Sequence, residues 1–110
     1  MSITVHIYYT GVHGSAQRFA REMIGQGVVS RIRSEDGNLQ YDYFFPMDDE
    51  ETVLLIDRWT DQRALDLHHQ TPMMAQISAL REKYDLHMRV ERYVSEAGGV
   101  PAQDQAFIRS

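Results

Sequence analysis

The sequence predicts an α+β fold of the ferredoxin-like type, with the element order β-α-β-β-α-β. Residues 3–9 alternate between apolar and other side chains, as expected for a strand with one buried face. Residues 15–33 repeat apolar side chains at helical spacing. Two further strand-like runs, residues 38–45 and 52–59, follow each other closely, as in a hairpin. This order predicts a sandwich in which an antiparallel sheet carries both helical segments on one face.

The first two elements are a strand over Ile3–Tyr9 and a helix over about Ser15–Arg33. The strand is rich in β-branched and aromatic residues, which favour an extended backbone. Ser15 is a plausible N-cap for the helix. Gly25 and Gly27 each cost about 1 kcal/mol relative to alanine inside a helix, so we expect a kink or an early end near Gly25.

The hairpin consists of strands over Asn38–Phe45 and Thr52–Trp59, joined by a proline-containing acidic loop. Its register decides where Asn38 points. If the loop has an even number of residues centred on residues 48–49, Asn38 lies opposite Trp59 on the same face of the sheet. An odd loop would turn Asn38 to the other face.

Thr60 or Asp61 can cap a short helix that ends near Gln70. Pro72 then restarts a helix at the favoured first position. The chain ends its folded part with a strand over Leu86–Val94. The restarted helix has one apolar face, formed by Met73, Ile77, Leu80 and Tyr84.

Length and composition predict one folded domain over residues 1–95 and a polar tail over residues 96–110. The chain has 110 residues, of which 43% are hydrophobic and 25% charged, an ordinary globular composition. The tail contains several turn-forming residues, so we expect it to be frayed or docked through Phe107 and Ile108.

Several classes of protein are disfavoured. The chain has no cysteine, which excludes disulfides and thiolate zinc sites. Its net charge of -5 argues against nucleic acid as a partner. We find neither a membrane-spanning apolar run nor a signal peptide at the start, so we expect no membrane partner and a cytoplasmic protein. The five histidines show no metal-ligand spacing, so no metal site is predicted.

Both faces of the predicted sheet carry large apolar side chains. The first strand has Ile3, Val5 and Ile7 on one face and Tyr8 on the other. A sheet face exposed to water should alternate cleanly with polar residues, so the second face is expected to contact another subunit. A twofold homodimer through this sheet face would bury both copies of it at once. The hairpin repeats the pattern, with Leu39, Tyr41, Tyr43 and Phe45 on one face and Phe44 on the other.

Two adjacent histidines, His68 and His69, lie on the short helix. Ala64, Leu65 and Leu67 define its predicted buried stripe. At about 100° per residue, His68 falls inside this stripe and His69 lies further round the helix. We therefore expect His68 to point inward and His69 to face solvent or an edge.

An inward His68 would lie beside a strand that ends in Asp57 and Trp59. Neutral imidazole can accept a proton near neutral pH, so His68 is the best candidate for an acid/base group in the chain. The alternative interpretation is a hydrogen-bonded core histidine.

The sequence resembles the antibiotic biosynthesis monooxygenase superfamily of small dimeric α+β barrel proteins, which includes cofactor-free quinol monooxygenases. The resemblance covers Ile3 to about Tyr93. Where the family usually has a glutamate, this chain has the shorter Asp57. The family's Glu-x-Gly-x-x-x-Tyr falls on Glu35, Gly37 and Tyr41, its acid-x-Trp on Asp57 and Trp59, and its Ala-Leu-x-x-His on Ala64, Leu65 and His68.

The resemblance implies oxygenation of an electron-rich aromatic, a quinol, phenol or polyketide anthrone, by O2 without a cofactor. Under this hypothesis His68 is the base, Trp59 is an aromatic wall with an N–H donor, and Asn38 is a hydrogen-bond partner for the substrate. We interpret Glu35, Gly37 and Tyr41 as structural residues at a helix end, a turn and the core. The substrate-binding wall is expected to contain Asp57, Tyr41, Leu65 and Met73.

Two other functions fit the same residues. Some relatives bind and degrade haem, and His68 facing Trp59 could serve as axial ligand and wall. The first strand has no asparagine of the kind that such members tend to carry, which disfavours this reading. The chain could also be a non-catalytic dimer that binds a small aromatic molecule.

Overall fold

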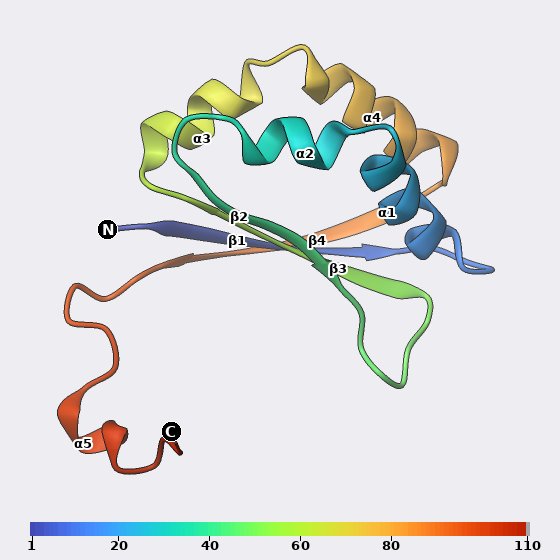
Figure 1. Ribbon diagram of the computed structural model, residues 1–110. Helices are drawn as coiled ribbons and strands as arrows, with labels where there is room; N and C mark the ends of the chain where they lie inside the picture. The colour runs from blue at the N-terminus through green and yellow to red at the C-terminus, as the bar shows by residue number, and fades with distance from the viewer. Residues whose placement is uncertain (110) are drawn as a thin grey trace.

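An antiparallel sheet of four strands forms one layer of the molecule (Figure 1). The structure, a computed structural model, describes residues 1–109, and Ser110 of the predicted tail lies outside this range. The strands lie in the order β2-β3-β1-β4, so the first and third strands are central. This arrangement confirms the predicted ferredoxin-like α+β class. The strands are β1 (Ile3–Thr10), β2 (Asn38–Phe44), β3 (Thr52–Trp59) and β4 (His87–Val94).

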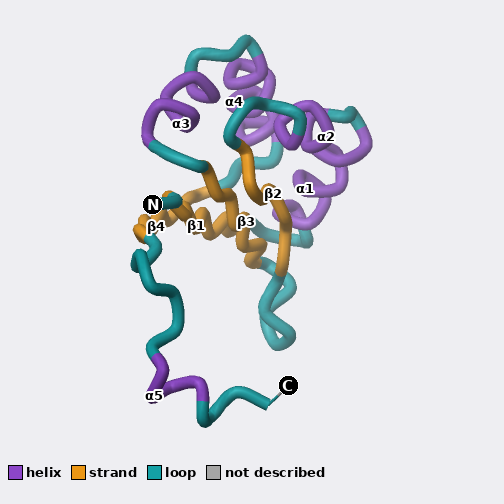
Figure 2. Tube along the Cα trace, turned by 60° about the vertical axis from the view of Figure 1, so that its left-hand side comes forward, coloured by secondary structure: helices purple, strands orange, loops and turns teal. Residues whose placement is uncertain are grey.

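Four helices cover one face of this sheet (Figures 1 and 2). The other face carries no helix from the first 94 residues. The molecule therefore has two layers, and its core lies between them. The helices are α1 (Ser15–Gly25), α2 (Val28–Arg33), α3 (Gln62–His69) and α4 (Met73–Lys83).

Both helical segments are interrupted where the sequence indicates a break. Gly27 adopts a left-handed φ of 76° between α1 and α2, a conformation that glycine reaches without a steric penalty. The Asp61 carboxylate caps α3 by accepting a hydrogen bond of 2.9 Å from the Ala64 N–H. Pro72 then precedes α4. The expected early end near Gly25 is confirmed.

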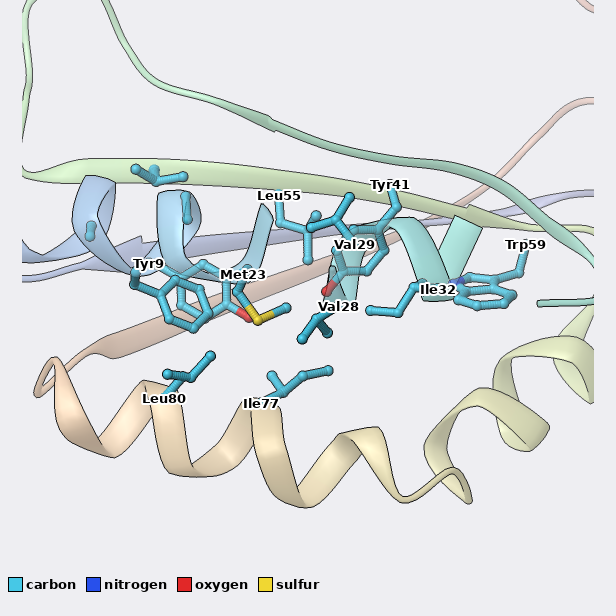
Figure 3. Close-up of a cluster of buried hydrophobic side chains, with 14 of the residues drawn as sticks. Tyr9, Met23, Val28, Val29, Ile32, Tyr41, Leu55, Trp59, Ile77 and Leu80 are labelled. Atoms are coloured by element: carbon cyan, nitrogen blue, oxygen red, sulfur yellow. The ribbon is translucent and has the colours of Figure 1, made fainter. Parts of the chain in front are cut away.

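The core is built from the helix-facing side chains of the sheet and the inward faces of the helices. Figure 3 shows Tyr9 and Leu55 of the sheet directed towards Ile77 and Leu80 of α4. Alternate residues of β3 are buried, which is the pattern of a strand that packs on one face only. The largest completely buried side chains are Trp59, Tyr9, Phe19, Met23, Ile32, Leu55, Ile77 and Val28.

The hairpin register differs from the prediction. Tyr41 pairs with Asp57 and Tyr43 with Leu55, so the hairpin is centred on a single residue and its loop is odd. An irregularity between Asn38 and Gln40 then shifts the register by one residue. Because of this bulge, Asn38 still lies opposite Trp59, although the even loop that we expected is absent.

Two apolar residues of the hairpin are more exposed than the alternation predicts. Leu39 is 48% exposed because it occupies the bulge, and Phe45 is 54% exposed because it lies beyond the end of β2. Tyr41 and Tyr43 do face the helices. On the uncovered face, Tyr8 and Ile56 are half-buried within this single chain.

The tail leaves the end of β4 on the side of the sheet away from the four helices (Figures 1 and 2). It contains the short helix α5 (Ala102–Gln105), none of whose residues is buried. Phe107 is 89% exposed. No helix within residues 1–109 has the length and apolar character needed to cross a membrane.

Candidate active site

His68 lies at the corner where α3 meets the end of β3. It is 4% exposed, and its ring stacks at a tilt of 31° on Trp59 with 4.7 Å between ring centroids. His69 is exposed, so the predicted orientation of the pair is confirmed. The prediction for Leu67 is wrong, because this residue is 50% exposed. The buried stripe of α3 is Ala64, Leu65 and His68.

Glu35 binds the inward histidine. Its carboxylate oxygens lie 3.0 and 3.1 Å from His68 Nδ1. A proton on Nδ1 that is donated to this carboxylate leaves Nε2 as the acceptor nitrogen of a neutral ring. Among residues 1–109, Nε2 has no hydrogen-bond partner. The pair therefore has the geometry of a base that is oriented by a second group.

Gly37 allows this contact by bringing the turn before β2 close to α3. Its φ is +83°, and a Cβ at this position would lie 2.5 Å from Ala64 Cβ and 2.7 Å from Thr60 Oγ1. The Thr60 N–H also donates a 2.8 Å hydrogen bond to the Gly37 carbonyl. Any larger residue would push the turn, and Glu35 with it, away from His68.

The sequence patterns predict a structural role for Glu35 and do not pair it with His68. Both residues were present in the family motifs, but in separate ones that lie 33 residues apart. The sequence signal for this pair is an acid, Glu35, two residues before Gly37, together with the inward His68. Only the turn geometry shows that the two side chains meet.

Asn38 lies at the bulge opposite Trp59. Its amide nitrogen donates to the carbonyls of Gln40 at 3.2 Å and Arg58 at 3.4 Å. These two bonds use both amide protons. The side chain therefore bridges the two strands where the ladder is irregular.

Asp57 is buried between the layers next to the stacked pair. It is 5% exposed, and its Oδ1 has no hydrogen-bond partner among residues 1–109. Burial raises the pKa of Asp57 from its ordinary value of 3.8 to about 6, while the Trp59 indole and Arg81 offset part of the rise. By hydrogen-bond distance and angle, Trp59 Nε1 and the Tyr43 hydroxyl likewise have no partner in the described chain, although the Trp59 N–H lies close enough to Asp57 to lower its pKa. Buried polar atoms without partners are uncommon, so each one calls for a structural or functional explanation.

Arg81 brings a positive charge from α4 to this polar cluster. Its guanidinium donates to the Tyr9 hydroxyl at 2.8 and 3.1 Å and lies 5.5 Å from the centre of that ring. Burial raises the pKa of Tyr9, and Arg81 partly offsets this effect. Burial also raises the pKa values of Tyr41 and Tyr43. Sequence reasoning missed Arg81, although it lies four residues after the inward Ile77.

The remaining predicted wall residues lie on the two helices above this cluster. Leu65 is buried on α3, and Met73 packs half-buried against the core at the start of α4. A cavity of about 300 Å³ lies between α3 and the turn at residues 36–37. His68 and Trp59 do not line this cavity. No group of three His, Asp or Glu residues within residues 1–109 could hold a metal ion.

Replacing Asp57 with asparagine is expected to stabilise the protein at neutral pH. Because the pKa of this carboxyl is higher in the folded than in the unfolded state, its effect on the free energy of unfolding is most favourable below about pH 3.8. This contribution is lost as pH rises through about 6. The rise in pKa corresponds to about 3 kcal/mol. The stability advantage of Asp57→Asn over wild type should therefore grow by about 2–3 kcal/mol as pH rises from 4 to 7. Urea unfolding of both proteins across this range measures the difference. A difference that does not change with pH would contradict the assignment.

The chain belongs to the antibiotic biosynthesis monooxygenase family, whose sequence pattern it matches over residues 2–80. The resemblance inferred from the motifs is thereby confirmed.

Solved structures share this fold. PA3566 from Pseudomonas aeruginosa is 27% identical, with a TM-score of 0.73 over 87% of this chain and 95% of its own. SnoaB from Streptomyces nogalater, a cofactor-independent oxygenase, is 15% identical, with a TM-score of 0.71 over 86% of this chain and 93% of its own.

One curated relative also matches in sequence. "Putative monooxygenase YcnE" of Bacillus subtilis is 37% identical over 46 residues. The match covers 42% of this chain and 48% of YcnE, so it spans about half of the relative's length.

Proposed function

We propose that this protein is a cofactor-independent monooxygenase that uses O2 to oxidise an electron-rich aromatic, such as a quinol, a phenol or a polyketide anthrone. The observation that carries the proposal is the buried His68, which Glu35 holds through Nδ1 against the ring of Trp59. Family membership supports the reaction class. SnoaB, which shares the fold, is a cofactor-independent oxygenase.

The substrate itself supplies the electrons in this reaction. His68 Nε2 removes a proton from the phenol or anthrone, and the anion transfers one electron to O2. The two radicals combine to form a C–O bond, and the resulting peroxide loses water. An anthrone CH2 group and O2 thus become a carbonyl and water, with no external reductant. His68 returns its proton to the departing oxygen.

Other residues of the site bind and orient the reactants. We assign binding of the substrate oxygen or the peroxide to the Trp59 N–H and the Asp57 carboxyl, because Trp59 Nε1 and Asp57 Oδ1 have no hydrogen-bond partner in the described chain. Leu65 and Met73 form apolar walls that exclude water. We assign Asn38 a positioning role, because both of its amide protons bond to backbone carbonyls at the bulge. The direct substrate contact expected from the sequence stays a prediction, and it would use the amide oxygen of Asn38.

A surface cavity of about 300 Å³ lies between α3 and the turn at residues 36–37. Ala64 lines this cavity and also belongs to the buried stripe that carries His68. We propose that the substrate enters on this side of α3.

Oxygen uptake by metal-stripped protein tests the proposed function. We expect uptake above the no-enzyme rate with at least one member of a panel of hydroquinones and anthrones, and no loss of activity with added chelator. Uptake equal to background would contradict the proposal. A Soret shift on titration with hemin, or saturable binding of the aromatic without uptake, would then identify a haem protein or a binding module.

We further propose that two copies associate through the uncovered sheet face. Tyr8, Leu54 and Ile56 are half-buried there, and Phe44 is 46% exposed. His6 also lies on this face, in edge contact with Tyr93. Pairing two such faces removes apolar surface from water on both copies. Light scattering should give twice the chain mass of 12.8 kDa.

A further inference from the structure

The C-terminal tail carries apolar side chains that remain at least half exposed to solvent. Val100 is 50%, Ile108 53% and Phe107 89% exposed. The tail helix α5 has four residues and buries none of them. Helices this short are unstable in water without tertiary contacts. Docking onto a second surface would remove these side chains from water.

A matching surface lies between α1 and the end of β2. We call it the α1–β2 groove; its cavity measures about 260 Å³. This volume is below the roughly 300–1,000 Å³ typical of small-molecule sites, and it suits one or two side chains. Ile24 is 57% exposed at its rim. The groove is lined mainly by Ala20, Ile24, Tyr43, Phe44, Phe45 and Val53, with Arg21 beside them.

We propose that the tail of one copy docks Phe107 and Ile108 into the α1–β2 groove of a second copy. This inference rests on the proposed sheet-face dimer and is independent of the monooxygenase proposal. It assigns the tail a function in assembly. Charge fits as well, because Arg21 beside the groove and Asp104 of α5 have no ion-pair partner within residues 1–109.

The topology favours a second copy over the tail's own domain. The tail leaves from β4 and the groove borders β2, and these strands are the two opposite edges of the sheet. A tail that returned to its own groove would have to cross the uncovered face, which the proposed dimer buries. The tail already lies on the side of the sheet where the second copy would sit (Figures 1 and 2).

The tail is long enough for this path. In a face-to-face dimer whose twofold axis runs along the strands, the β4 edge of one copy lies over the β2 edge of its partner. The tail must then cover about the length of β1, roughly 23 Å, along the strands and about 20 Å from its own sheet past the partner's sheet to the partner's helix layer, a direct distance of about 30 Å. The 13 residues from Val94 to Phe107 span about 36 Å if α5 stays helical and the other nine residues are extended.

Disulfide trapping tests the inference directly, because the chain contains no cysteine. The double variant Arg109→Cys/Ile24→Cys, which keeps Phe107 and Ile108, should form a disulfide-linked dimer under mild oxidation, seen on a non-reducing gel. The matched control is Arg109→Cys/Leu67→Cys, whose second site is similarly exposed but lies on α3. A product at monomer mass with both thiols consumed, or trapping no greater than in the control, would overturn the inference.

Dimer affinity gives a second readout. Phe107→Ala should raise the dimer dissociation constant at least tenfold, whereas Met47→Ala, at a fully exposed loop position, should leave it unchanged. An unchanged constant for Phe107→Ala would count against docking. Light scattering of the unmodified chain separates the two proposals: a monomer refutes the dimer itself, and a dimer without trapping refutes only the docked tail.

Discussion

Replacing His68 with alanine is expected to lower the rate of oxygen uptake by about 10²–10⁴-fold on any aromatic that the wild-type protein oxidises, which is the usual contribution of a general base. The reason is geometric: Glu35 holds Nδ1, so Nε2 is left to take the substrate proton. Initial rates from an oxygen electrode, with urea unfolding to confirm folding, make the measurement.

The adjacent histidine provides the matched control. His69→Ala removes an exposed imidazole from the same helix and should leave uptake within about twofold of wild type. Glu35→Gln should cause an intermediate loss and change the pH profile of the rate, because the ring loses its charged partner. A folded His68→Ala variant with wild-type rates would remove His68 from the mechanism.

Gly37→Ala is expected to destabilise the protein by about 2–5 kcal/mol. A left-handed φ costs a residue with a Cβ about 1–2 kcal/mol, and forcing a methyl group into a packed contact costs about 1–3 kcal/mol more. The added Cβ would lie 2.5 Å from that of Ala64. Urea unfolding curves of the variant and wild type measure the loss.

Gly27→Ala separates the cost of the left-handed backbone from the cost of the steric contact with α3. Gly27 has a similar φ of +76°, but a Cβ there would meet nothing within 4 Å. We expect a loss of about 1–2 kcal/mol from the backbone alone. Equal losses for Gly27→Ala and Gly37→Ala would show that the turn does not press against α3. A folded Gly37→Ala variant should also lose activity, as Glu35→Gln does.

The buried polar groups of the candidate site lower the stability of the folded protein. Asp57 and Trp59 place unpaired polar atoms in the core, and the pKa of Asp57 rises to about 6 because its charge is buried. A residue selected for stability alone would be apolar at position 57, like Leu55 and Val53 on the same face of β3. Polar groups kept in such a place are typical of functional sites.

The fold followed from local patterns in the sequence. Alternation in residues 3–9 and 52–59, the glycines near residue 25 and the Thr71–Pro72 break each act over a few residues, so the strands and helix ends could be predicted. The inward orientation of His68 followed from helical angle alone. Helical angle could not predict that Leu67 is exposed, because the neighbouring elements decide which flank of a helix is buried.

The sequence by itself determined the element order, the fold class and the identity of the inward histidine, since these depend on periodicity and on backbone preferences of single residues. Only the tertiary structure decided that Glu35 meets His68, that a bulge places Asn38 opposite Trp59, and that Arg81 reaches Tyr9. Each of these contacts joins segments that are distant in the chain, or depends on a one-residue shift in strand pairing. Such contacts are set by how the layers pack, and a shift of one residue in register reverses the face on which a side chain lies.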